Sequence, residues 1–145
     1  MRKCLCFMMI ILILIASPCI AGQTDKQSEN IYGYDEELAI ANLASDFAEC
    51  SAYYIIAAEA LRRTAKEDLA QKALEESDRA YLYAIKFSNP KVAAARTRLA
   101  FDKQRKEMGH DFSNFPTLTL KYEKMCRDAL ESPEERLEYW LKKKD

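Results

Sequence analysis

Few side chains in this sequence are of the types that bind metals or catalyse reactions. His110 is the only histidine, and Glu107 precedes it with the Glu-x-x-His spacing of carboxylate-bridged di-iron bundles. Such a centre needs a second copy of this motif and further inward-facing glutamates, and Gly109 interrupts the helix that would align the pair. We therefore expect His110 to be a solvent-exposed loop residue, and we predict no metal site and no cofactor.

Nucleophilic and acid–base catalysis also lack the residues they need. The sequence has no G-x-S-x-G and no C-x-x-C-H motif, and its glycines lie too far apart to form a phosphate-binding loop. Asp46, Glu49 and Glu59 could act as acid and base, but they lie off the apolar side of their helix, where side chains are expected to face water. The sequence predicts no catalytic residue and a protein that is not an enzyme.

The first 21 residues have the three-part layout of a secretory signal peptide. The segment begins with two basic residues, continues with an uncharged apolar run over 4–16, and ends in small residues, so we predict cleavage between Ala21 and Gly22. Two other interpretations stay open. The segment could be an uncleaved anchor, although about 20 apolar residues are needed to cross a membrane. It could instead direct lipid attachment to Cys19, although Pro18 occupies a position that requires a small residue. We expect a periplasmic or secreted protein with no stable membrane insertion after cleavage.

The cysteine count supports export. Only Cys50 and Cys126 remain after cleavage of residues 1–21. Two cysteines in an oxidising compartment predict one disulfide, and the alternative is a pair of buried free thiols.

The rest of the chain is expected to form one domain. Residues 22–34 are polar and aperiodic and predict a flexible leader, while 35–145 suffice for a single core. The formal net charge of the chain is only −1, which argues against a general nucleic-acid binder.

Helical signals dominate residues 35–145. A turn at 64–67 and another at 132–135 each match the capping-box pattern, Asn89-Pro90 resembles a helix start, and Gly109 suits a helix end. Before the first turn, apolar residues recur at alternating spacings of three and four and predict a stripe along one helix. The stripe consists of Ile40, Leu43, Phe47, Cys50, Tyr54, Ala57 and Leu61.

These signals predict an all-α fold. Four helices with short connections favour an antiparallel up-and-down four-helix bundle, with a short C-terminal fifth helix covering an end or side. Cys50 lies on the first helix and Cys126 on the fourth. These helices are neighbours in such a bundle, which is consistent with the disulfide.

Two regions are candidate partner-binding surfaces. In the uncharged segment 51–58, Tyr53 and Ile56 point away from the apolar stripe, so they are either buried on several sides or form an exposed apolar patch. The third helix, over 90–108, is rich in lysine and arginine, and Arg98, Arg105 and Lys106 could dock an acidic partner. Alternatively, these charges balance the acidic first helix within the molecule.

The C-terminal helix offers a third, weaker candidate. Trp140 precedes a run of lysines and could lie on a membrane surface, but the helix is short and its first turn is acidic, so a docked cap is the favoured interpretation.

These observations favour a non-enzymatic interaction protein, such as an inhibitor, immunity-like or adaptor protein, that binds an unknown protein of the cell envelope or exterior. The alternative is a carrier that holds an apolar small molecule among the aromatic residues of the bundle. An apolar cavity of about 300 Å³ or more would favour the carrier.

Overall fold

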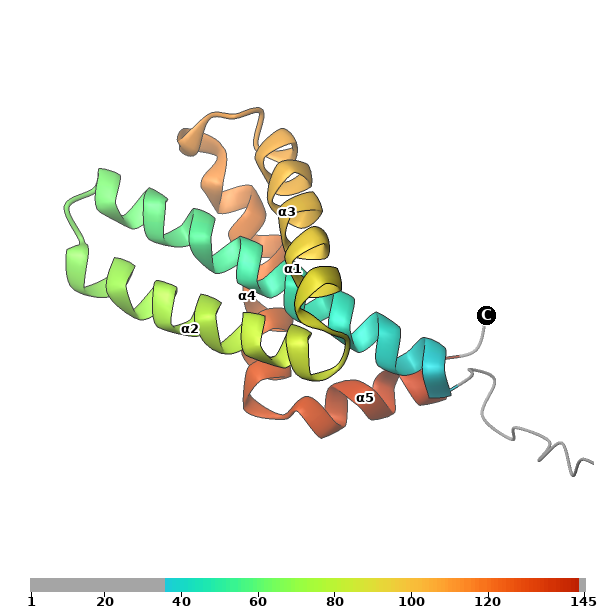
Figure 1. Cartoon of the computed structure of the whole chain (residues 1–145). Coiled ribbons are helices and arrows are strands. Elements are labelled where there is room, and N and C mark those ends of the chain that lie inside the picture. The colour runs from blue at the N-terminus through green and yellow to red at the C-terminus, as the bar shows by residue number, and fades with distance from the viewer. Residues whose placement is uncertain (1–35, 144–145) are drawn as a thin grey trace, which may run out of the picture.

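The computed structural model describes residues 36–143, which form helices joined by short connections and contain no strand (Figure 1). The predicted signal peptide, 1–21, and leader, 22–34, lie outside the described residues. The elements are α1 (Glu36–Arg63), α2 (Glu67–Lys86), α3 (Pro90–Glu107), the 3₁₀ turn η1 (Phe112–Asn114), α4 (Phe115–Glu131) and α5 (Pro133–Lys142). The described part of the chain is thus an all-helical bundle, as predicted.

Two helix boundaries follow the local rules that predicted them. Asn89 caps α3, because its side-chain oxygen accepts a hydrogen bond from the backbone N–H of Val92 at 3.0 Å, and Pro90 follows at the first helical position. Gly109 adopts φ +64° just after α3, a conformation that costs glycine little.

Both predicted capping boxes are wrong, although the helix boundaries lie where they were expected. The Thr64 hydroxyl donates to the carbonyl of Leu61 at 2.9 Å and so belongs to the end of α1, while Glu67 pairs with Arg62. The chain then turns through Ala65, whose φ is +55°. Ser132 precedes α5 without making a side-chain capping bond.

Helix α1 is the centre of the fold and contacts α2, α3, α4 and α5. Its buried residues extend well beyond the single stripe that the sequence suggested, because α1 is covered on several sides. Many of them are alanines, whose small side chains allow the neighbouring helices to approach closely. Ala57 and Ala58 of α1 form one such cluster with Ala70 and Ala73 of α2.

The predicted cysteine pair is confirmed at disulfide distance. The Sγ atoms of Cys50 and Cys126 lie 2.17 Å apart, with their Cα atoms 5.2 Å apart, and both residues are fully buried. The pair joins the middle of α1 to α4 across 76 residues of sequence.

The last helix, α5, is held against the first half of α1 (Figure 1). The carboxylate of Asp46 accepts hydrogen bonds from Arg136 Nε and Trp140 Nε1, both at 2.6 Å. The expectation that Asp46 faces water is therefore wrong: the residue is only 8% exposed. Burial raises the pKa of Asp46, and the hydrogen bonds from Arg136 and Trp140 oppose that rise. This buried contact docks α5 on the domain.

No helix in 36–143 has the length and apolar character needed to cross a membrane.

Candidate functional site

An open groove of about 530 Å³ lies between α2 and α4, with α1 as its floor. Its lining combines apolar and aromatic side chains with charged ones. The floor on α1 consists of Tyr53, Tyr54, Ala57 and Leu61, the α2 wall of Leu69, Lys72, Ala73, Glu76 and Arg79, and the α4 wall of Phe115, Thr119, Glu123, Arg127, Leu130 and Glu131.

Aromatic packing makes the floor of the groove firm. Tyr53 stacks on Phe115 of α4 with ring centroids 6.1 Å apart, and its ring lies 5.2 Å from that of Tyr54. Beside these rings, Ala57 and Ala73 contribute only methyl groups, so the space between the helices is not filled. Leu69, on the α2 side, is 48% exposed. The groove thus presents apolar surface to solvent, a property typical of binding sites.

Charged residues from both helices line the edges. On α2, Arg79 pairs with Glu76 at 3.4 Å, and on α4, Arg127 pairs with Glu123 at 3.7 Å. Arg79 also donates a hydrogen bond to the carbonyl of Leu130. This bond links α2 to α4 at one end of the groove.

The two tyrosines of the floor stay protonated over the physiological range. Burial, together with the nearby Glu76 and Glu123 carboxylates, raises the pKa of Tyr54 to about 12, while Arg127 acts in the opposite direction. Burial also raises the pKa of Tyr53. A phenol with a raised pKa is a poor general base. These two phenols are therefore poorly suited to accept a proton.

Tyr53 and Ile56 do not form an exposed patch. Ile56 is fully buried and Tyr53 is 4% exposed, so the candidate surface based on these two residues is wrong and the alternative, burial on several sides, is correct. The reason is that α1 is enclosed by its neighbours. Tyr53 nevertheless contributes to the floor of the groove, whereas Ile56 belongs to the core.

The basic residues of α3 have separate environments. Arg105 lies 3.8 Å from Glu59 of α1 and packs on the ring of Phe112, so its charge is partly balanced within the molecule. Arg98 and Lys106 are exposed, and no ion pair involves them in the part of the chain that the structure describes. The structure therefore leaves two of the three proposed docking residues on the outer surface.

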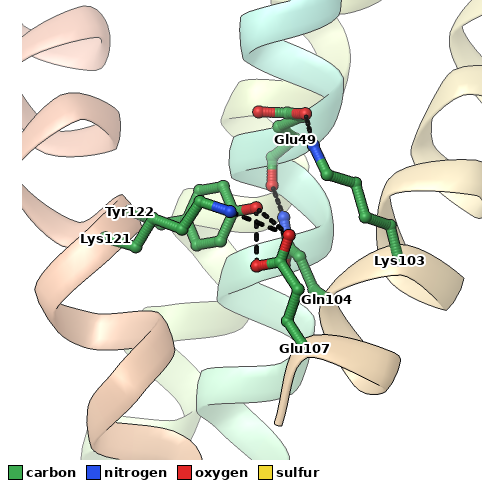
Figure 2. A network of polar contacts seen from close by, with 6 residues as sticks. All are labelled: Glu49, Lys103, Gln104, Glu107, Lys121 and Tyr122. Carbon is green, nitrogen blue, oxygen red and sulfur yellow. Dashed lines mark hydrogen bonds and ion pairs between the residues drawn. The ribbon is translucent and has the colours of Figure 1, made fainter.

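A polar network joins the inner side of α3 to α1 and α4 (Figure 2). Lys103 Nζ contacts the Glu49 carboxylate, and Gln104 Nε2 donates to the Glu49 carbonyl, each at 2.9 Å. Lys121 Nζ lies 2.8 Å from the Glu107 carboxylate, and the Tyr122 hydroxyl donates to that carboxylate at 3.1 Å. Burial opposes ionisation of Glu107, but these two partners lower its pKa. We interpret the network as a structural connection between helices.

Among the described residues, no group of three or more histidine, cysteine, aspartate or glutamate side chains is arranged to hold a metal ion. His110 is exposed and lies in the turn after α3, with φ +58°.

A second hollow, of about 500 Å³, lies between α4 and α5. Lysine, arginine, serine and carboxylate side chains make up most of its wall, so it offers less apolar surface than the groove.

The chain matches no protein-family model, no curated protein and no solved structure. No pattern in the sequence predicted the groove, because its lining comes from three helices and its depth depends on small residues such as Ala73.

Proposed function

We propose that this protein is an exported, non-enzymatic interaction protein that binds a segment of a partner protein in the groove between α2 and α4. The observation that carries the proposal is the groove: an apolar, aromatic floor, an exposed Leu69 and charged edges. Partner sites commonly combine an apolar centre with a polar rim.

The openness of the groove favours a protein segment over an apolar small molecule. Small-molecule sites typically bury 70–90% or more of the ligand surface, which requires a deep cleft or an enclosed cavity. A groove on the surface leaves one side of its occupant in water. An amphipathic helix suits this situation, because its apolar face covers the groove while its polar face stays solvated.

Export is part of the same proposal. The predicted signal peptide at 1–21 is supported by the pairing of the two remaining cysteines, since disulfides persist mainly in oxidising compartments. The partner would then lie in the cell envelope or outside the cell.

For the architecture, we propose the antiparallel up-and-down arrangement of α1 to α4, with α5 as a cap. Pairs of contacting residues support it. As the residue number increases along α1, the residue number of the contacted partner decreases in α2, increases in α3 and decreases in α4. These pairs are Phe47–Tyr83 and Ser51–Ser77 for α2, Ala41–Arg96 and Glu49–Gln104 for α3, and Cys50–Cys126 and Tyr53–Tyr122 for α4.

A carrier of an apolar small molecule is the second candidate. The volume of the groove favours it, because about 530 Å³ lies within the range of small-molecule sites. The aromatic floor formed by Tyr53, Tyr54 and Phe115 would then contact the ligand.

Site-specific photocrosslinking tests the proposal. A photoreactive phenylalanine analogue at Leu69 should crosslink the partner in the native host, whereas the same analogue at Leu99 should not. Leu99 is a matched control, because it is 70% exposed and lies on α3, away from the groove.

The crosslinked partner is then purified and its affinity measured by calorimetry. Leu69→Glu should weaken binding about tenfold, because burial of the exposed half of Leu69 contributes roughly 1 kcal/mol and glutamate adds the cost of desolvating a charge, and Leu99→Glu should have no effect. Equal losses in the two variants would refute the groove as the site. Stoichiometric recovery of an apolar molecule from the purified protein, displaced by Leu69→Glu, would favour the carrier instead.

A further inference from the structure

The groove has the length of a short helical segment. Its α2 wall extends from Leu69 to Arg79, about 15 Å at 1.5 Å per helical residue. This distance corresponds to roughly three turns of a bound helix lying along the groove. Such a helix would place three or four apolar side chains, spaced by three or four residues, over the floor.

Carboxylates from both walls lie near the same point of the floor. Glu76 belongs to α2 and Glu123 to α4, both line the same groove, and both carboxylates lie near enough to Tyr54 to raise the pKa of its phenol. Two like charges on opposite walls do not neutralise each other. A positive charge brought between them would be stabilised by both.

Arginines follow one turn farther along each wall. Arg79 comes three residues after Glu76, and Arg127 comes four residues after Glu123. Arg79 contacts the carbonyl of Leu130, which lies one turn beyond Arg127, so the two guanidinium groups are at the same end of the groove. A negative charge placed between the two arginines would be stabilised by both, while Glu131 of the α4 wall and Asp128 beside Arg127 oppose it.

The ion pairs that these residues form within each helix are weak competitors. Glu76–Arg79 and Glu123–Arg127 are separated by 3.4 and 3.7 Å, and all four side chains are between 43 and 53% exposed. Exposed pairs of this kind contribute little to stability. Their charges therefore remain available to a ligand.

We propose that the groove recognises an amphipathic helix of a partner protein that carries one basic and one acidic residue about one turn apart beside its apolar stripe. The basic side chain lies between Glu76 and Glu123, and the acidic side chain lies beside Arg79 and Arg127. This inference depends on the proposed function, because it specifies the occupant of the same groove.

Two synthetic peptides of about 15 residues, long enough to form helix, test the charge rule by fluorescence anisotropy. Both carry leucines on one helical face, with blocked ends. The charged peptide has Lys and Glu four residues apart beside that face, and the neutral peptide has Gln at both positions. The wild-type chain should bind the charged peptide about fivefold or more tightly than the neutral one, and high salt should reduce this difference.

Variants of the groove edge then locate the effect. Glu76→Gln/Glu123→Gln should strongly reduce the preference for the charged peptide and leave binding of the neutral peptide unchanged, and Arg127→Gln should also reduce the preference. Asp78→Asn/Glu134→Gln is the matched control, since both residues are exposed and lie outside the groove, and it should keep the preference. Circular dichroism melting shows that each variant folds.

The outcomes separate this inference from the proposed function. Equal binding of the two peptides by wild type, with loss of both in Leu69→Glu, would overturn the charge rule and leave the groove as a binding site. Equally weakened binding of both peptides by Glu76→Gln/Glu123→Gln would also overturn it, because the charge rule predicts weaker binding of the charged peptide alone. Failure of wild type to bind either peptide would overturn the inference and count against the proposed function.

Discussion

Removal of the link between α1 and α4 is the perturbation with the largest expected effect on stability. The pair Cys50–Cys126 closes a loop of 76 residues. In the chain-entropy model, a loop of this length restricts the unfolded chain by about 4.5 kcal/mol at 25 °C. Domains of this size are commonly stable by only about 5–15 kcal/mol. The disulfide therefore accounts for a large share of the free energy of unfolding.

The variant Cys50→Ala/Cys126→Ala removes the link without leaving a free thiol. Urea titration followed by circular dichroism should show a loss of about 4 to 5 kcal/mol relative to the oxidised protein. Thermal unfolding should shift downward by roughly 20 °C, because 1 kcal/mol corresponds to about 4–8 °C in a domain of this size. Both cysteines are fully buried, so loss of packing adds to the effect rather than opposing it.

Chemical reduction separates the link from packing. The reduced wild type keeps both sulfur atoms, and its unfolding free energy should fall nearly as far as that of the double variant. If the double variant and the oxidised protein unfold within 1 kcal/mol of each other, the reasoning from loop closure is wrong. Two alkylatable thiols in the natively exported protein would show that the link does not form.

Four further predictions concern other parts of the chain. Asp46→Ala should lower the free energy of unfolding by about 2 to 3 kcal/mol in urea titration and increase amide exchange in α5, because Arg136 and Trp140 lose their buried acceptor. Unchanged amide exchange in α5 would contradict this role of Asp46. The pKa of Tyr54 is higher in the folded chain than in the unfolded chain, so the contribution of its protonated phenol to stability should be present below pH 10 and decrease as the pH rises towards 12. An ultraviolet titration in which every tyrosine ionises near pH 10 would contradict the raised pKa. Arg98→Glu/Lys106→Glu should leave the fold intact and should not change association with the partner crosslinked at Leu69, because both residues lie outside the groove; slower association at low salt would show that α3 also docks that partner. The intact mass of the exported protein should correspond to residues 22–145, and recovery of uncleaved protein from membranes would support the anchor instead.

Local signals in the sequence predicted the helices well. Asn89 and Gly109 mark helix ends through their own backbone preferences, which do not depend on distant residues. The cysteine pair was predictable because Cys50 and Cys126 are the only cysteines in residues 22–145. Thr64 was misinterpreted because a hydroxyl near a helix junction can bond to either helix, and here it bonds to the earlier one.

Long-range contacts were beyond the sequence analysis. The burial of Asp46 depends on Arg136, which is 90 residues away in the sequence. The groove likewise requires α2 and α4 to lie on either side of α1, and no periodicity within one helix indicates that arrangement. Tyr53 and Ile56 were recognised as unusual, but the covering of α1 by its neighbours decides that they are buried.

The central claim is that a partner segment occupies the groove between α2 and α4. Amide chemical-shift mapping by NMR tests it most directly, with the ¹⁵N-labelled protein titrated by the segment that crosslinks at Leu69. The account predicts the largest shifts at Ala57, Ala73 and Thr119, one residue from each helix that lines the groove. Shifts centred on the outer face of α3 around Leu99, with the groove residues unchanged, would contradict it.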